Sequence, residues 1–172
     1  TNLTIDSTNF LDSGASYNGG AIYLGNTNAL INNSLFNNTS TPWGNGGVMY
    51  VAGNVTINNI TVLNFKASGD NGGVYFHEGT STLSNSSFDG YNTIIVSPKA
   101  SLNLTNTNVT GDNSNRDLCY LENDYDPITN QVFYSVWNDG NLSLANNDLA
   151  YVIFNNGTIS RSEERFSRNA ET

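Results

Sequence analysis

The residues from Gly19 to Phe36, GGAIYLGNTNALINNSLF, combine a glycine pair, an apolar segment, a polar break, a second apolar segment and a phenylalanine. The same formula returns at Gly46 as GGVMYVAGNVTINNITV and at Gly72 as GGVYFHEGTSTLSNSSF. Self-similarity with a period of this length indicates a repeat architecture, in which each unit stacks on its neighbours. We therefore expect the repeat to determine the fold.

One aliphatic residue defines the register of the repeat. Its first three intervals are equal, the fourth is shorter and the fifth is much longer. The position two residues later is asparagine in every repeat except the first, which has Ser7, and the position five residues later is always apolar. Chance is a poor explanation for this agreement. The register residues are Ile5, Ile31, Ile57, Leu83, Leu104 and Leu144.

Two of these positions have a physical interpretation. Equivalent residues of stacked repeats lie about 4.8 Å apart, so we expect the apolar position to form an interior stack in which each member contributes about 1.5–3 kcal/mol by burial. The asparagine position should form an amide ladder at a turn, since a buried amide without a partner costs about 1–3 kcal/mol. The core stack comprises Phe10, Phe36, Val62, Phe88, Val109 and Leu149. The ladder comprises Asn33, Asn59, Asn85, Asn106 and Asn146.

Each full repeat contains three short apolar segments, as in Ala21–Leu24, Ala29–Ile31 and Leu35–Phe36. Three short strands per coil predict three parallel sheets, which make an all-β, pectate-lyase-like parallel β-helix of about six coils. Its hand should be right, because parallel β-connections are strongly biased that way. A β-sandwich is the alternative, but it gives no reason for the fixed positions.

Alternation along the first segment predicts which side chains point inward. The expected inward pairs are Ala21 and Tyr23, Val48 and Tyr50, Val74 and Phe76, Ile94 and Val96, and Tyr134 and Val136. The positions expected to face outward are Leu24, Val51, His77, Ser97 and Trp137.

The composition limits the possible functions. Charged residues make up 12% of the 172 residues, against about 25% in an average protein, and the net charge is −9. This balance opposes binding to nucleic acid or to anionic lipid. Cys119 is the single cysteine, so no disulfide within the chain is possible. No apolar run is long enough to span a bilayer and no signal peptide is present, so we expect no membrane insertion by this chain. The chain begins at Thr1 inside a repeat, so we expect an internal fragment.

The repeat covers residues 1–160 and is interrupted once. The interruption, residues 111–130, lacks apolar periodicity and should be a protruding loop, which in repeat proteins often carries binding. After it, a further repeat begins and is not completed. The last twelve residues, RSEERFSRNAET, match the translation of a short-read sequencing adapter. We expect residues 161–172 to be an artefact, with a natural charged tail or capping helix as the alternative, and exclude them from the fold.

The interruption contains the weak candidates for a metal site. Glu122, Asp124 and Asp126 are oxygen ligands of the kind that Ca²⁺ prefers. A solvated acidic loop explains them better, since no EF-hand loop or GGxGxD repeat is present. No cofactor is predicted.

Nothing in the sequence supports catalysis. A polysaccharide lyase needs a cationic base or calcium beside Arg or Lys, and a glycoside hydrolase needs paired carboxylates. Before Arg161 the basic residues are Lys66, Lys99 and Arg116, and no two of them share a register. We therefore predict no catalytic residue. Contact with sugar rings is a minority hypothesis for three aromatic residues, Trp43, Tyr91 and Trp137.

The copies GGAI, GGVM and GGVY, with repeats that close in SLFNNTS or SSFDGY, resemble adhesin-like surface proteins. These right-handed parallel β-helices are abundant in methanogenic archaea and are similar to chlamydial polymorphic outer-membrane proteins. The resemblance implies a secreted, surface-displayed stalk that contacts surface glycans or other cells. The expected function is therefore structural and adhesive, at the cell surface and without catalysis. The alternatives are a carbohydrate-active β-helix enzyme and a non-catalytic glycan-binding module.

Overall fold

The computed structural model describes residues 2–67, 72–90, 92–110, 134–150 and 152–162. These residues form nineteen β-strands and no helix. Every strand pair among them is parallel. The predicted all-β class with parallel sheets is confirmed. Within this described part, no helix is long and apolar enough to cross a membrane.

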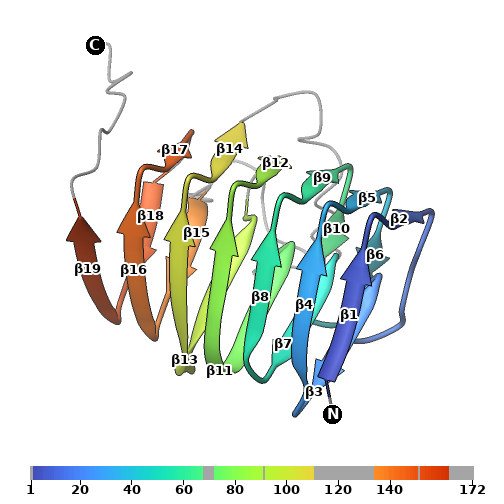
Figure 1. Ribbon diagram of the computed structural model, residues 1–172, viewed down its shortest axis with the longest axis horizontal. Coiled ribbons are helices and arrows are strands. Elements are labelled where there is room, and N and C mark those ends of the chain that lie inside the picture. The colour runs from blue at the N-terminus through green and yellow to red at the C-terminus, as the bar shows by residue number, and fades with distance from the viewer. Residues whose placement is uncertain (1, 68–71, 91, 111–133, 151, 163–172) are drawn as a thin grey trace, which may run out of the picture.

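The strands lie in three rows, and within each row a strand pairs with the equivalent strand of the next repeat (Figure 1). The first row, at the front of Figure 1, contains β1 (Asn2–Asp6), β4 (Asn28–Asn32), β8 (Val55–Asn58), β11 (Val74–Ser84), β13 (Ile94–Thr105), β16 (Asn141–Ala145) and β19 (Thr158–Ser162). The second row, along the upper edge, contains β2 (Asn9–Leu11), β5 (Leu35–Asn37), β9 (Thr61–Leu63), β12 (Ser87–Asp89), β14 (Asn108–Thr110) and β17 (Asp148–Leu149).

The third row is joined to the first through the two long strands, since β11 and β13 pair at their N-terminal ends with strands of the third row. Its other members are β3 (Ile22–Gly25), β7 (Met49–Ala52), β15 (Tyr134–Asn138) and β18 (Val152–Asn155). A short separate pair consists of β6 (Ser40–Thr41) and β10 (Lys66–Ala67).

The register residues pair in the order of the sequence. Ile5 is paired with Ile31, Ile31 with Ile57, and Ile57 with Leu83, so each partner is the equivalent residue of the next repeat. Leu83 then pairs with Leu104 and Leu104 with Leu144. The chain thus advances by one strand position for each repeat, and the inward side chains of the three rows form one continuous buried cluster.

One expectation about the third row is wrong. Tyr23, expected to point inward, is 60% exposed, whereas Leu24 and Val51, expected to face outward, are 3% and 0% exposed. The alternation of inward and outward side chains is therefore displaced by one residue in β3 and β7 relative to the expected pattern.

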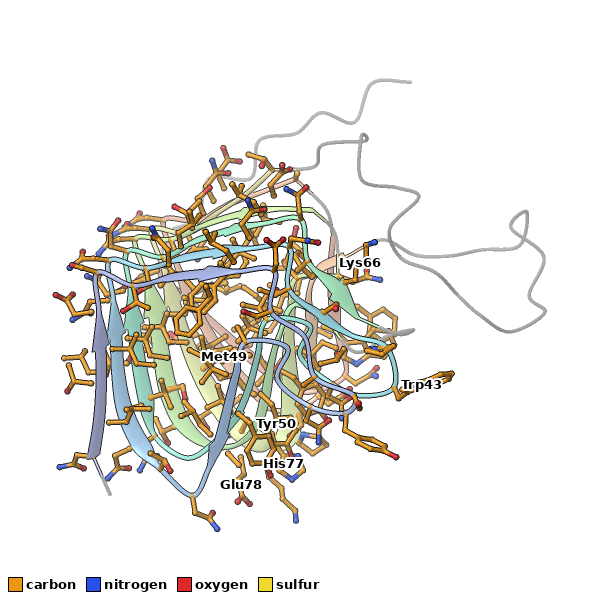
Figure 2. All side chains as sticks on the ribbon, turned by 90° about the vertical axis from the view of Figure 1, so that its right-hand side faces the viewer. Trp43, Met49, Tyr50, Lys66, His77 and Glu78 are labelled. Carbon is orange, nitrogen blue, oxygen red and sulfur yellow. The ribbon has the colours of Figure 1, made fainter. Side chains whose placement is uncertain are left out.

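A bulge at the start of β7 explains the displacement. The amides of Val48 and Met49 both donate to the carbonyl oxygen of Gly73, at 2.9 and 3.2 Å, so two residues oppose one. An extra residue of this kind reverses which face each later side chain occupies. Met49 consequently points into the interior and Tyr50 lies on the outer side of the row (Figure 2). The same arrangement recurs at β3, where two consecutive amides donate to the carbonyl oxygen of Val48.

The long strands β11 and β13 follow the expected alternation at their beginning. In β11 the expected inward residues Val74 and Phe76 are buried. In β13, however, Ser97 was expected to face outward and is buried instead. Its hydroxyl donates to the carbonyl oxygen of His77, so the buried polar group has a partner.

Candidate functional site

The five ladder asparagines occupy left-handed turn positions and have exposed side chains. Asparagine tolerates positive φ better than most residues with a Cβ, because its short polar side chain can hydrogen-bond locally. The backbone conformation thus explains why the position is so regular, and Ser7, with a φ of 51°, shares it. The φ angles are 49° for Asn33, 53° for Asn59, 51° for Asn85, 47° for Asn106 and 55° for Asn146.

The side-chain amides of four of these asparagines, Asn33, Asn59, Asn85 and Asn106, join neighbouring repeats, but the series shifts position once. Nδ2 of Asn59 donates to Oδ1 of Asn33 at 2.8 Å, and Nδ2 of Asn106 donates to Oδ1 of Asn85 at 3.2 Å. Between these bonds, Nδ2 of Asn85 donates to Oδ1 of Asn58 at 2.7 Å. All three bonds lie at the exposed surface, so the expectation that buried amides enforce the pattern is wrong.

The buried polar side chains at this turn are those of the residue that follows a ladder asparagine. The sequence analysis did not single out this position. Ser34, Ser86 and Thr107 are buried. The Ser86 hydroxyl accepts the amide of Ile60 at 3.2 Å and donates to the carbonyl oxygen of Ser84 at 2.7 Å. Such bonds satisfy backbone groups whose burial without a partner would cost about 1–3 kcal/mol. The signal in the sequence is the Ser or Thr that follows the asparagine position in most repeats.

The six residues of the expected core stack lie on the second row and pair in sequence order. The four central ones are buried, and the two end ones are partly buried against the core. At the N-terminal end the rings of Phe10 and Phe36 stack with centroids 4.8 Å apart and planes 1° from parallel. The members are Phe10, Phe36, Val62, Phe88, Val109 and Leu149.

A second series of rings lies on the outer side of the third row. Tyr23 stacks on Tyr50 at a centroid distance of 5.0 Å, and Tyr50 stacks on Tyr75 at 5.6 Å. The imidazole of His77 packs against the last two, at 5.4 and 6.2 Å. We call Tyr23, Tyr50, Tyr75 and His77 the aromatic stripe. Figure 2 shows Tyr50 and His77 together on this outer side, next to Glu78.

Two tyrosines of the stripe, Tyr50 and Tyr75, have a raised pKa. Burial raises the pKa of Tyr50, and the neighbouring Tyr23, Tyr75 and Glu78 raise it further by charge repulsion. The pKa of Tyr75 is raised by burial and by the negative charge of Asp139. Both phenols therefore remain protonated near neutral pH, where they can donate and accept hydrogen bonds but do not act as bases.

The three aromatic residues proposed for glycan contact do not form one site. Trp137 lies on β15, where its ring stacks on Phe154 at 4.0 Å and its Nε1 donates to Oδ2 of Asp139 at 2.9 Å. Trp43 lies in the loop between β6 and β7 and is 68% exposed. Tyr91 lies outside the described residues. β7 and β15 are separated by β11 and β13, so the two tryptophans lie in different regions of the molecule.

The structure aligns one acid with one base on adjacent strands. Glu78 of β11 pairs with Lys99 of β13, because the register shifts between Phe76 and Glu78. The weak metal candidates Glu122, Asp124 and Asp126, with the rest of the interruption at 111–130, lie outside the described residues. Within the described ranges, no group of three or more His, Cys, Asp or Glu side chains is placed to hold a metal ion.

Neither a protein-family model, a curated protein nor a solved structure matches the chain. The geometry of the repeat, the aromatic surfaces and the alignment of Glu78 with Lys99 are therefore the observations that bear on function.

Proposed function

We propose that this chain is a segment of a right-handed parallel β-helix of about six coils, and that it serves as a non-catalytic, adhesive shaft of a protein displayed at the cell surface. In this proposal the repeats provide length and rigidity. The loops that leave the rows contact glycans or surface proteins of other cells.

The observation that carries the proposal is the parallel pairing of each strand with its equivalent in the next repeat. Strands one repeat apart pair in parallel in both the first and the second row, and their inward side chains share one core. A stack of this kind grows in one dimension by adding repeats, which suits an extended shaft. The aromatic residues exposed on its surface, Trp43 at 68%, Tyr17 at 71% and Tyr23 at 60%, are suited to contact.

An adhesion assay tests the function. Beads coated with the chain, attached through a terminal tag, are counted on surfaces that carry immobilised cell-wall polysaccharide or whole cells. Beads coated with a β-sandwich domain of similar net charge serve as the control. We expect the chain to retain several times more beads under flow than the control. Equal retention of both would contradict the adhesive proposal.

A carbohydrate-active enzyme is the second candidate, and the pairing of Glu78 with Lys99 is the observation that favours it. Adjacent strands here carry a carboxyl and an amino group at the same register, and each can serve as a proton donor or acceptor. Release of reducing ends or of unsaturated products from polysaccharides, abolished in Lys99→Met, would support this alternative. The shaft proposal expects no product from either protein.

A further inference from the structure

Two equivalent loops, residues 14–20 and 41–47, lie directly against each other where the chain enters the third row. A side-chain carbon added at Gly44 would lie 1.7 Å from the carbonyl oxygen of Tyr17, so only glycine permits this contact. The amide of Asn45 donates to Oδ1 of Asn18 at 2.9 Å, and the amide of Gly19 donates to the carbonyl oxygen of Asn45 at 3.0 Å. The two loops thus form one hydrogen-bonded unit.

The backbone around Trp43 is fixed although its side chain is not buried. Thr41 is fully buried, and its hydroxyl donates to the carbonyl oxygen of Gly44 at 3.2 Å, which closes the turn around Pro42 and Trp43. Proline further restricts the turn, because its ring fixes φ. The indole nevertheless extends away from the body of the molecule (Figure 2).

Tyr17 on the neighbouring loop is a second exposed ring. Tyr17 and Trp43 are 71% and 68% exposed, more than any other large apolar side chain described. Tryptophan and tyrosine are buried to a large extent in most proteins. Two rings exposed on one rigid unit therefore indicate a contact surface, since no ordering of the loops is needed before a ligand binds.

The surroundings of the two rings indicate the class of ligand. The loop sequences, GASYNGG and TPWGNGG, contain no charged residue, and the same loops carry the exposed hydroxyl of Ser16 and the half-buried side-chain amides of Asn18 and Asn45. Within these two loops a charged partner would gain no ion pair. A pyranose has an apolar face that stacks on an aromatic ring and hydroxyls that reach neighbouring amides, a combination of apolar and polar contacts that is typical of ligand sites.

We infer that Tyr17 and Trp43 form a recognition site for an uncharged, pyranose-based glycan chain. The inference rests on the proposed adhesive function and assigns one of its contacts to named residues. Trp137 does not belong to this site, because its ring is stacked on Phe154 and its N–H is bonded to Asp139.

The test is a titration of the chain with neutral hexasaccharides of glucose, mannose and N-acetylglucosamine, and with an acidic hexasaccharide of galacturonic acid. In Trp137→Phe the indole of Trp43 is the single tryptophan, so its fluorescence reports directly on the site. We expect at least one neutral hexasaccharide to change this fluorescence. Calorimetry should then give an affinity roughly tenfold lower for Trp43→Ala, lower by a smaller factor for Trp43→Phe, and unchanged for Trp137→Phe.

The site is overturned if Trp43→Ala binds as tightly as the parent chain, if the galacturonic acid hexasaccharide binds and the neutral ones do not, or if none of the four binds. Unchanged thermal unfolding of Trp43→Ala shows that a loss of binding is not a loss of folding. The bead assay separates this result from the proposed function. If parent and Trp43→Ala beads adhere equally, adhesion stands and the site is wrong; if parent beads do not adhere, the proposed function itself fails.

Discussion

The molecule stacks aromatic rings in two places, one inside the three rows and one outside. In the second row, Phe10 lies 4.8 Å from Phe36 with the ring planes 1° apart. On the outer side of the third row, Tyr23 lies 5.0 Å from Tyr50 with the planes 6° apart. The geometry is nearly the same, because in both places the spacing of paired strands sets the distance between rings. The environment differs, since Phe36 is fully buried whereas Tyr23 faces solvent.

This difference separates two contributions of aromatic side chains to stability that usually occur together, ring stacking and the removal of the ring from water. Ring stacking alone is worth about 0.5–1.5 kcal/mol beyond area burial. Removing water from an aromatic side chain adds about 1.5–3 kcal/mol. The inner rings receive both contributions, and the exposed end of the aromatic stripe receives mainly the first. The core stack, which we also call the inner column, should therefore determine the stability of the fold. The aromatic stripe, the outer column, is available for contact with a ligand or partner.

The largest expected effect is on the inner column. Phe88→Ala should lower the free energy of unfolding by about 3–5 kcal/mol, because the side chain is fully buried and its loss leaves a cavity. Tyr23→Ala, at the exposed end of the stripe, should cost about 0.5–1.5 kcal/mol. Urea unfolding followed by circular dichroism measures both values. Equal losses in the two variants would contradict the distinction between the columns.

The next effect concerns the hydroxyl column inside the turn. Ser86→Ala should cost about 1–3 kcal/mol, since the buried amide of Ile60 then loses its acceptor. Ser86→Thr is the matched control, because Thr107 occupies the equivalent position of the next repeat and keeps the hydroxyl. Both variants can be compared by urea unfolding. If Ser86→Ala is as stable as the parent chain, the buried hydroxyl is not needed at the turn.

The exposed asparagines should act through backbone conformation. Asn59→Ala should cost about 1–2 kcal/mol, because alanine is strained at the φ of 53° found there. Asn59→Gly removes the same amide but accepts this φ, so we expect it to retain most of the stability. Thermal unfolding of the two variants separates the contributions. A loss in Asn59→Gly as large as that in Asn59→Ala would assign the effect to the side-chain hydrogen bond.

The smallest effect appears at high pH and tests the outer column. The pKa of Tyr50 is raised in the folded chain above its ordinary value of 10.0. Stability should be unaffected by this group below pH 10.0 and should fall as the pH rises from there through the folded pKa, because the unfolded chain loses the proton first. Urea midpoints measured across this range should fall less steeply in Tyr50→Phe. Identical pH dependence in the parent chain and the variant would exclude this contribution.

The sequence predicts the inner column well because its periodicity and its burial have the same origin. Each apolar position must lie above the equivalent one, and the alignment therefore identifies the pairs from Phe10 to Leu149 directly. The sequence also identifies the asparagine positions, but the expected cause, a buried side-chain amide, is wrong. The left-handed backbone conformation at these positions explains the preference for asparagine.

The outer column was not predictable from alignment. The glycine pairs at 46–47 and 72–73 look equivalent, but two amides share the carbonyl oxygen of Gly73. A bulge depends on local hydrogen bonding and leaves no gap in the repeat, yet it moves the following side chains of the same strand to the other face. Tyr23 and Tyr50 were therefore placed inside. The exposure of Trp43 is likewise set by tertiary contacts of its loop, which residue identity alone does not specify.

The parallel pairing of equivalent strands has a mechanical consequence. A folded repeat adds one strand spacing, about 4.8 Å, to the length of the stack. The residues of one repeat, fully extended, span roughly 90 Å. A repeat that detaches under tension can therefore extend to roughly twenty times the length that it adds to the folded stack. In the proposed shaft the repeats beyond it would keep their own pairing, so we expect the stack to be rigid at low load and to yield in steps when the load exceeds the strength of one interface.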